Sequence, residues 1–140
     1  MNIRIFYDEI KYRIRGVKNV KNLIEKVIMG ENKIPGDLNF IFTNDKKLRE
    51  LNMKFLKHDY FTDVIAFSYS DNNIIKGEIY ISIDTVRINA INYKVSSNKE
   101  IIRVIIHGTL HLCGMDDKTK SEQILMRKRE DRWLEEFKEK

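Results

Sequence analysis

Two histidines four positions apart, His107 and His111, have the spacing of a metal site. Residues at i and i+4 project from the same face of an α-helix, so both imidazoles can reach one ion. Gly114 follows, and a glycine there can adopt the left-handed conformation that ends a helix and turns the chain back. The turn brings a carboxylate, Asp117, within reach of the same ion. We therefore predict a metal centre made by His107, His111 and Asp117.

Three protein ligands leave at least one coordination position open for water, as in catalytic rather than structural zinc sites. A bound metal lowers the pKa of that water and makes hydroxide available near neutral pH, which is the chemistry of a hydrolase. We expect one Zn²⁺, or another divalent transition metal, since Asp117 is a harder donor than histidine. The alternative is that the apolar helix simply buries both histidines.

The same spacing occurs in the metzincin motif H-E-x-x-H-x-x-G-x-x-H, with two substitutions. Asp117 replaces the last histidine, and Gly108 replaces the glutamate that serves metallopeptidases as the general base. Peptide hydrolysis is therefore disfavoured. Glycine inside a helix costs about 1 kcal/mol relative to alanine, so Gly108 indicates that another part of the molecule approaches closely.

Periodicity predicts the elements that position these residues. Alternating apolar residues predict strands, and apolar residues at helical spacing predict helices. The strands are expected over 2–7, 38–42, 64–69 and 77–82, and the helices over 17–29, 45–53, 84–95, 101–113 and from 120 onward. The pattern indicates an α+β fold with a small mixed sheet of about four strands packed with helices. The metal-site helix is expected at the centre, as in zincins, within a single domain spanning 1–140.

Several local signals set the expected boundaries. Pro35-Gly36-Asp37 predicts a turn before the second strand. Asp84 is the expected N-cap of a helix that buries Ile88, Ile91 and Val95 on one face. Ser97 with Glu100, and Thr119 with Glu122, have the spacing of capping boxes before the last two helices.

The composition is that of a globular protein with no membrane span. The 140 residues are 42% apolar and 34% charged, and no stretch is long and apolar enough for a secretory signal or a transmembrane helix. The single cysteine, Cys113, fits a reducing compartment, so we expect a cytoplasmic protein. The net charge of +5 arises entirely within residues 1–60 and favours a polyanionic partner such as RNA.

Three segments resemble the YbeY family of bacterial endoribonucleases. HGTLHLCGMDD, over 107–117, matches the family signature H-G-x-L-H-L-x-G-x-D-H at every fixed position except the last, where Asp117 stands. The segment from Leu51 to Phe67 is similar to L-N-x-x-Y-R-G-x-D-x-P-T-D-V-L-S-F, and 77–82 is similar to the family's G-D-I-x-I-S strand. The resemblance covers residues 51 to 117.

The resemblance implies a zinc-dependent hydrolase that cleaves single-stranded RNA. It also implies a role in maturing the 3′ end of small-subunit rRNA and in ribosome quality control, with the rRNA precursor and the ribosome as partners and no membrane. A second hypothesis is a ribosome-associated RNA-binding factor whose metal is structural, and a metallopeptidase is a more distant one. Neither the general base nor the nucleophile follows from the residues.

The chain departs from the family at Leu56, where the resemblance implies an arginine that faces the substrate phosphate. Lys54, Lys57 and His58 are the nearby candidates for RNA contacts, although a solvated loop is an equal interpretation. Arg103 lies one helical turn before His107 on the same face. It is expected either to contact a phosphate or to pair with Glu100.

Overall fold

In the computed structural model, which describes residues 2–56 and 62–137, strands and helices follow one another with short connections. The strands are β1 (Ile3–Tyr7), β2 (Ile34–Thr43), β3 (Val64–Ser68) and β4 (Ile74–Ser82). The helices are α1 (Val17–Gly30), α2 (Asp45–Leu56), α3 (Ile83–Tyr93), α4 (Ser97–Leu112) and α5 (Lys120–Glu136).

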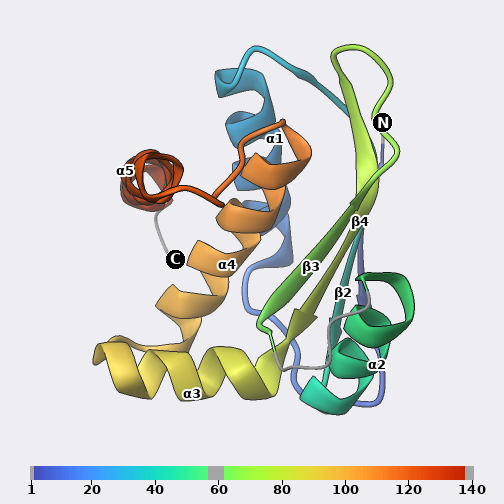
Figure 1. The fold of residues 1–140 in the computed structure, drawn as a ribbon, viewed down its shortest axis with the longest axis vertical. Coiled ribbons are helices and arrows are strands. Elements are labelled where there is room, and N and C mark those ends of the chain that lie inside the picture. The colour runs from blue at the N-terminus through green and yellow to red at the C-terminus, as the bar shows by residue number, and fades with distance from the viewer. Residues whose placement is uncertain (1, 57–61, 138–140) are drawn as a thin grey trace.

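The described strands form one mixed sheet in the order β1-β2-β4-β3. β1 pairs with β2, and β2 with β4, in parallel, whereas β3 runs antiparallel to β4 at the edge. Helices α1, α4 and α5 lie to one side of the sheet, and α2 lies near its end, away from them (Figure 1). The predicted α+β fold with a small mixed sheet of about four strands is therefore confirmed.

Helix α4 contacts both the sheet and three other helices, which is the central position predicted for the metal-site helix. It contacts α1, α3, α5, β3 and β4, and its buried residues include a run of isoleucines and valine from Ile101 to Ile106. These side chains belong to the same hydrophobic core cluster as Leu38, Phe40 and Ile79 of the sheet. No helix in the described ranges, α4 included, is long and apolar enough to cross a lipid bilayer.

The glycine inside α4 allows the helix to pack tightly on the sheet. A Cβ atom added at Gly108 would lie 2.9 Å from Cγ2 of Ile79 on β4 and 3.4 Å from Cγ2 of Val64 on β3. The first distance is shorter than real Cβ contacts, so a larger residue here would require the Ile79 side chain, the sheet or the helix to shift. The expected close approach at Gly108 is therefore present, and the approaching element is the sheet.

Some expected boundaries were wrong. Pro35-Gly36-Asp37 is not a turn before the strand, because β2 begins at Ile34 and continues through this segment. The pairing with β4 shifts register between Pro35 and Leu38, so the strand accommodates proline and glycine as an irregularity. β4 likewise starts at Ile74 rather than at residue 77, and α2 extends to Leu56 rather than ending near Met53.

The capping predictions were correct for one helix and shifted for two. Thr119 and Glu122 form the expected capping box of α5. The N-cap of α3 is Ser82, whose hydroxyl accepts from Thr85 N, and the side chain of Asp84 instead accepts a bond from Asp45 N of α2. The N-cap of α4 is Ser96 rather than Ser97.

The expected buried face of α3 was also wrong. Ile88 and Ile91 are 56% and 76% exposed, and the helix instead buries Ile83, Val86 and Ala90. This helix is apolar on more than one face, so periodicity alone does not decide which face turns inward.

We predict that Gly108→Ala destabilises the protein, although alanine is the better helix former. Overpacking typically costs about 1–3 kcal/mol, which offsets the gain of about 1 kcal/mol in helix propensity. Urea unfolding of Gly108→Ala, Ile79→Ala and the double variant measures the coupling. The cost of Gly108→Ala should shrink once Ile79 is truncated. Additive effects of the two substitutions would contradict a direct contact.

Candidate metal centre

The apolar side of α4 determines where its two histidines point. Because that side packs on the sheet, His107 and His111 remain at the edge of the core, with 23% and 26% of their side chains exposed. Both line a pocket of about 620 Å³. Residues of β3, the end of α2 and the segment after α4 line the rest of it, including Asn52, Leu56, Thr62, Asp63, Val64, Ile65, Ala66, Ser68, Leu112, Asp116, Asp117 and Lys118.

The turn after α4 places Asp117 over the histidines. Gly114 has φ +101°, a left-handed conformation that favours glycine, and Met115 N donates to Leu110 O across the turn at 3.1 Å. Gln123 Nε2 of α5 then donates to the carbonyl of Asp117 at 3.2 Å. Asp117 is therefore held between the glycine turn and the start of α5, as its spacing predicts.

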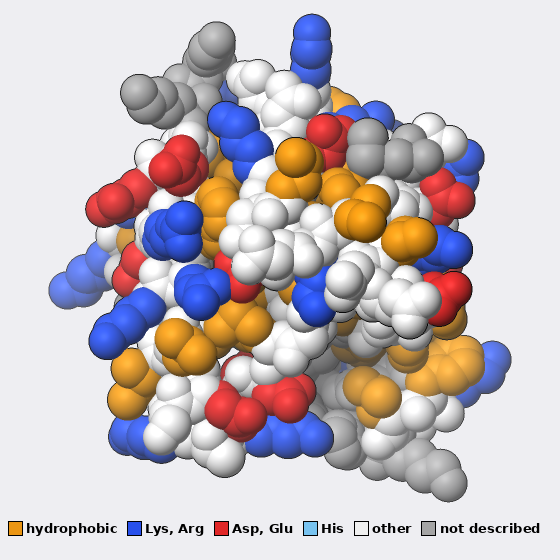
Figure 2. All heavy atoms as spheres, turned by 90° about the horizontal axis from the view of Figure 1, so that it is seen from above, with side chains coloured by type: hydrophobic (Ala, Val, Ile, Leu, Met, Phe, Trp, Pro, Cys, Tyr) orange, Lys and Arg blue, Asp and Glu red, His pale blue; other side chains and the backbone are white. Residues whose placement is uncertain are grey.

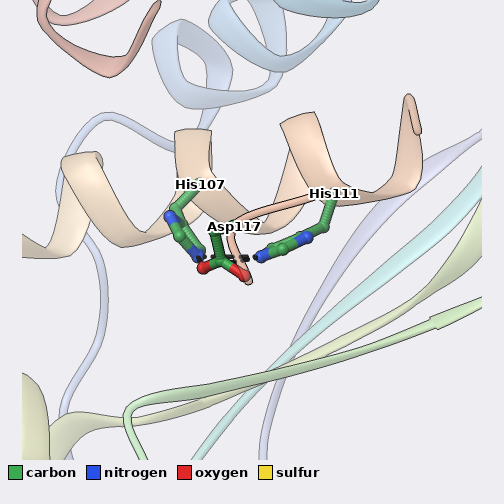
Figure 3. Close-up of side chains that lie close together, drawn as sticks. All are labelled: His107, His111 and Asp117. Carbon is green, nitrogen blue, oxygen red and sulfur yellow. Dashed lines mark hydrogen bonds and ion pairs between the residues drawn. The ribbon is translucent and has the colours of Figure 1, made fainter. Parts of the chain in front are cut away.

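Three ligand atoms converge at this point, and Figure 3 shows the side chains of His107, His111 and Asp117 directed toward one another. His107 Nε2 lies 3.0 Å from His111 Nε2. Asp117 Oδ2 lies 3.2 Å from the first nitrogen and 3.3 Å from the second. Tetrahedral ligands at zinc distances of about 2.0–2.1 Å are separated by about 3.3 Å. The donor set and its spacing therefore fit a single divalent transition metal.

A carboxylate that sequence analysis missed orients the first histidine. Glu130 of α5 is buried, and its Oε2 lies 2.6 Å from His107 Nδ1. Because a carboxylate can only accept, Nδ1 carries the proton and donates, which leaves the Nε2 lone pair for a metal. The signal available in the sequence was a glutamate four residues after Met126 and three before Trp133, on the buried face of α5.

Arg103 is bound by two carboxylates of α5. Its guanidinium donates to Glu130 Oε1 at 3.1 Å and to Asp131 Oδ1 at 2.7 Å. The expected partner Glu100 makes no such ion pair. A chain of charged groups therefore runs from Asp131 through Arg103 and Glu130 to His107, and both Glu130 oxygens are used.

Burial and charge act in opposite directions on the site's titrating groups. Burial lowers the pKa of His107, but the hydrogen bond and charge of Glu130, with Asp117 and Asp63, raise it above its ordinary value overall. Burial raises the pKa of Asp63, an effect that the nearby His107 partly offsets. Asp63 is thus a half-buried carboxyl near the ligand cluster, and it lines the pocket beside the histidines.

The remaining positions that the sequence singled out are Leu56, the residues expected to contact RNA, and Cys113. Leu56 lines the metal-site pocket and is 45% exposed, so the position at which the chain departs from the family does face the site. Lys54 is exposed, with its ammonium over the ring of Phe55. Lys57 and His58 lie outside the described residues.

Burial raises the pKa of Cys113 to about 12, which disfavours the thiolate that a metal would need.

Comparison with known proteins agrees with these motifs. A family model described as Endoribonuclease YbeY matches residues 6–138. Among curated proteins, the Endoribonuclease YbeY of Flavobacterium psychrophilum is 46% identical over 132 residues, covering 94% of each chain. That of Parabacteroides distasonis is 41% identical over 134 residues, covering 96% of this chain and 94% of the relative.

A solved structure agrees as well. The solution structure of TM1509 from Thermotoga maritima superposes with a TM-score of 0.65 at 30% identity, covering 97% of this chain and 89% of the other. The family model spans nearly all of the chain, and the relatives align over nearly their whole length. The chain therefore belongs to the Endoribonuclease YbeY family.

Proposed function

We propose that this protein is a metal-dependent endoribonuclease that cleaves single-stranded RNA, with Zn²⁺ held by His107, His111 and Asp117. The observation that carries the proposal is the convergence of three ligand atoms in an open pocket of about 620 Å³. Membership of a family whose relatives are named endoribonucleases supports the choice of RNA as substrate. The family resemblance of the motifs further supports a precursor of small-subunit rRNA as the substrate, with the ribosome as partner.

A divalent ion held by these three residues would supply a Lewis acid and would lower the pKa of a bound water. The protein contributes orientation. Glu130 holds the proton of His107 at Nδ1, and Arg103 occupies the second oxygen of Glu130. Because both partners are largely buried, the imidazole is held in one orientation before any ligand arrives.

The packing at Gly108 argues against a peptidase. The general base of metallopeptidases occupies this sequence position, next to the first histidine. Here a Cβ at position 108 would already collide with Ile79 of the sheet. The close packing of α4 on the sheet therefore accounts for the absence of a glutamate general base at position 108.

The surface charge is compatible with RNA. Figure 2 shows Lys and Arg side chains spread over one face of the molecule, interspersed with Asp and Glu. Phosphate contacts by such side chains release counterions, so we expect RNA affinity to fall with increasing salt.

The proposal is tested by cleavage of a labelled single-stranded RNA before and after removal of metal. Chelation should abolish cleavage by the wild type, and added Zn²⁺ should restore it, because the three ligands leave room for a reacting water. His111→Ala should lose bound metal, measured by elemental analysis, together with cleavage, while circular dichroism shows a folded protein.

Two results would overturn the proposal. Cleavage that survives chelation and the His111→Ala substitution would exclude a metal-dependent reaction. RNA binding without cleavage by the fully loaded protein would instead favour the RNA-binding factor with a structural metal.

Glu130→Gln should weaken metal binding about 10- to 100-fold, because outer-shell carboxylates orient metal-bound histidines. Glutamine keeps the shape of the side chain but removes the charge that holds the imidazole proton. The dissociation constant is measured by competition with a chromogenic chelator. Glu135→Gln is the matched control, since Glu135 lies on the same helix, is exposed and does not line the site. Equal affinities in the two variants would contradict the assigned role of Glu130.

Leu56→Arg should raise turnover on single-stranded RNA more than it tightens RNA binding. A guanidinium in the pocket can stabilise charge that develops on the phosphate, an effect worth on the order of 10- to 1000-fold. Met53→Arg is the control, because it adds the same charge to an exposed position of α2 outside the pocket. If Leu56→Arg and Met53→Arg change turnover equally, position 56 does not face the reacting phosphate.

A further inference from the structure

The segment between β1 and α1 carries arginines that lie outside the metal centre. From Tyr12 to Arg15 apolar and cationic residues alternate, and the structure buries Ile14, half-buries Tyr12 and exposes Arg13 and Arg15. The backbone N–H of Ile14 donates to the hydroxyl of Tyr7 on β1 at 3.2 Å. The segment is therefore anchored to the sheet by its inward residues, while its arginines face solvent.

Aromatic rings support two exposed guanidinium groups at this place. Arg13 lies 4.3 Å from the ring centroid of Tyr7, and Arg87 of α3 lies 5.6 Å from that of Tyr12. The rings of Tyr7 and Tyr12 in turn pack on Phe42 of β2, with centroids 5.7 and 6.1 Å from its own. Cation–π contacts of this kind hold a guanidinium in place on an aromatic surface. The two arginines therefore share one aromatic support, although they are far apart in the sequence.

Arg15 belongs to the same group. Burial and the neighbouring Tyr7 raise the pKa of Tyr12, whereas the charges of Arg87 and Arg15 act to lower it. Both guanidinium groups are therefore close enough to the phenol for their charges to act on it. We call Arg13, Arg15 and Arg87 the arginine cluster.

The arginine cluster keeps hydrogen-bond donors available for a ligand. No carboxylate in residues 2–56 and 62–137 forms an ion pair with any of its three members. Nη1 of Arg13 donates to the carbonyls of Ile10 and Tyr12 at 3.1 and 2.9 Å, which leaves its Nε and Nη2 hydrogens. Three neighbouring cations without a carboxylate partner favour an anionic ligand.

Helix α3 lies between the arginine cluster and the metal centre. On one side of α3, Asn89 donates to Asp63 at 3.4 Å, and Tyr93 lines a recess of about 300 Å³ that His107 also lines. Arg87 precedes Asn89 by two positions, so it projects from the opposite side of the helix, over Tyr12. Because a helix is only about 10–12 Å wide, one extended polymer can reach both places.

We propose that the arginine cluster binds the phosphodiester backbone of the RNA strand whose cleaved bond lies at the metal centre. This inference rests on the proposed function. Guanidinium groups bind phosphate oxygens through two parallel hydrogen bonds, and a guanidinium stacked on a ring keeps its N–H edge free for them. Phosphates repeat along the strand, so one RNA molecule can contact the metal centre and all three arginines. Such contacts position the strand without reading its bases.

The first test measures binding by fluorescence anisotropy, with the metal-loaded protein and a labelled single-stranded DNA. DNA presents the same phosphates and is not the substrate of an endoribonuclease, so the probe stays intact. Replacing all three arginines of the cluster by glutamine should weaken binding about tenfold or more. The slope of log K against log salt should become shallower by about 2, at about 0.7 for each lost phosphate contact. The loss should be larger for a long strand than for a short one, which cannot reach both places.

Two further triple variants separate charge from structure. Replacing the cluster by lysine keeps the three charges, so the salt slope should stay near that of the wild type although the two-pronged hydrogen bonds are lost. The matched control removes three exposed cations of α1 and α5 that line neither cavity at the metal centre, and it should keep the wild-type slope. Its substitutions are Lys26→Gln, Lys128→Gln and Arg132→Gln. Circular dichroism checks that each variant is folded.

The second test measures cleavage of a long single-stranded RNA, for which the glutamine variant of the cluster should show a raised KM. No measurable DNA binding by the wild type, an unchanged salt slope in the glutamine variant, or an equal change in the matched control would overturn the inference. These binding results do not depend on cleavage. Absence of cleavage by the metal-loaded wild type would instead overturn the proposed endoribonuclease function, whatever the binding shows.

Discussion

The close packing of α4 on the sheet is the constraint on which the rest of the site depends. Because Gly108 has no side chain, the helix approaches β3 and β4 closely enough that a Cβ would collide with Ile79. That contact sets the height and rotation of the helix, and with them the positions of His107 and His111 at the edge of the core. The same contact leaves no room for the glutamate that serves peptidases as general base. The packing at Gly108 therefore positions the two histidines and also disfavours peptide hydrolysis.

A site this close to the core must stabilise its charges by pairing them. Glu130 is buried and would be costly alone, but His107 and Arg103 each take one of its oxygens. Asp131, at the exposed end, takes the other side of the guanidinium. The metal ligand is thus connected to α5 by hydrogen bonds as well as by packing, and for this reason the last helix is part of the site although it supplies no metal ligand.

The sequence predicted the features that depend on residues close together in the chain. The i, i+4 histidines, the glycine turn and the Thr119 capping box involve residues near one another in the chain, and each lies where its spacing predicts. Strand order could not be predicted, because it depends on pairing between distant segments.

The predictions that failed required knowledge of the environment. Ile88 and Ile91 are exposed because α3 turns its other apolar face inward, and the hydrophobic pattern allowed both choices. Glu130, 23 residues from His107, reaches it only because α5 packs against α4. The same packing decides the ion-pair partners of Arg103. Glu100, on the same helix, was the expected partner, but Glu130 and Asp131 of α5 bind the guanidinium. Glu100 instead lines a recess beside the metal centre. The partners of charged residues on buried helix faces are therefore hard to predict from the sequence, because elements far along the chain supply them.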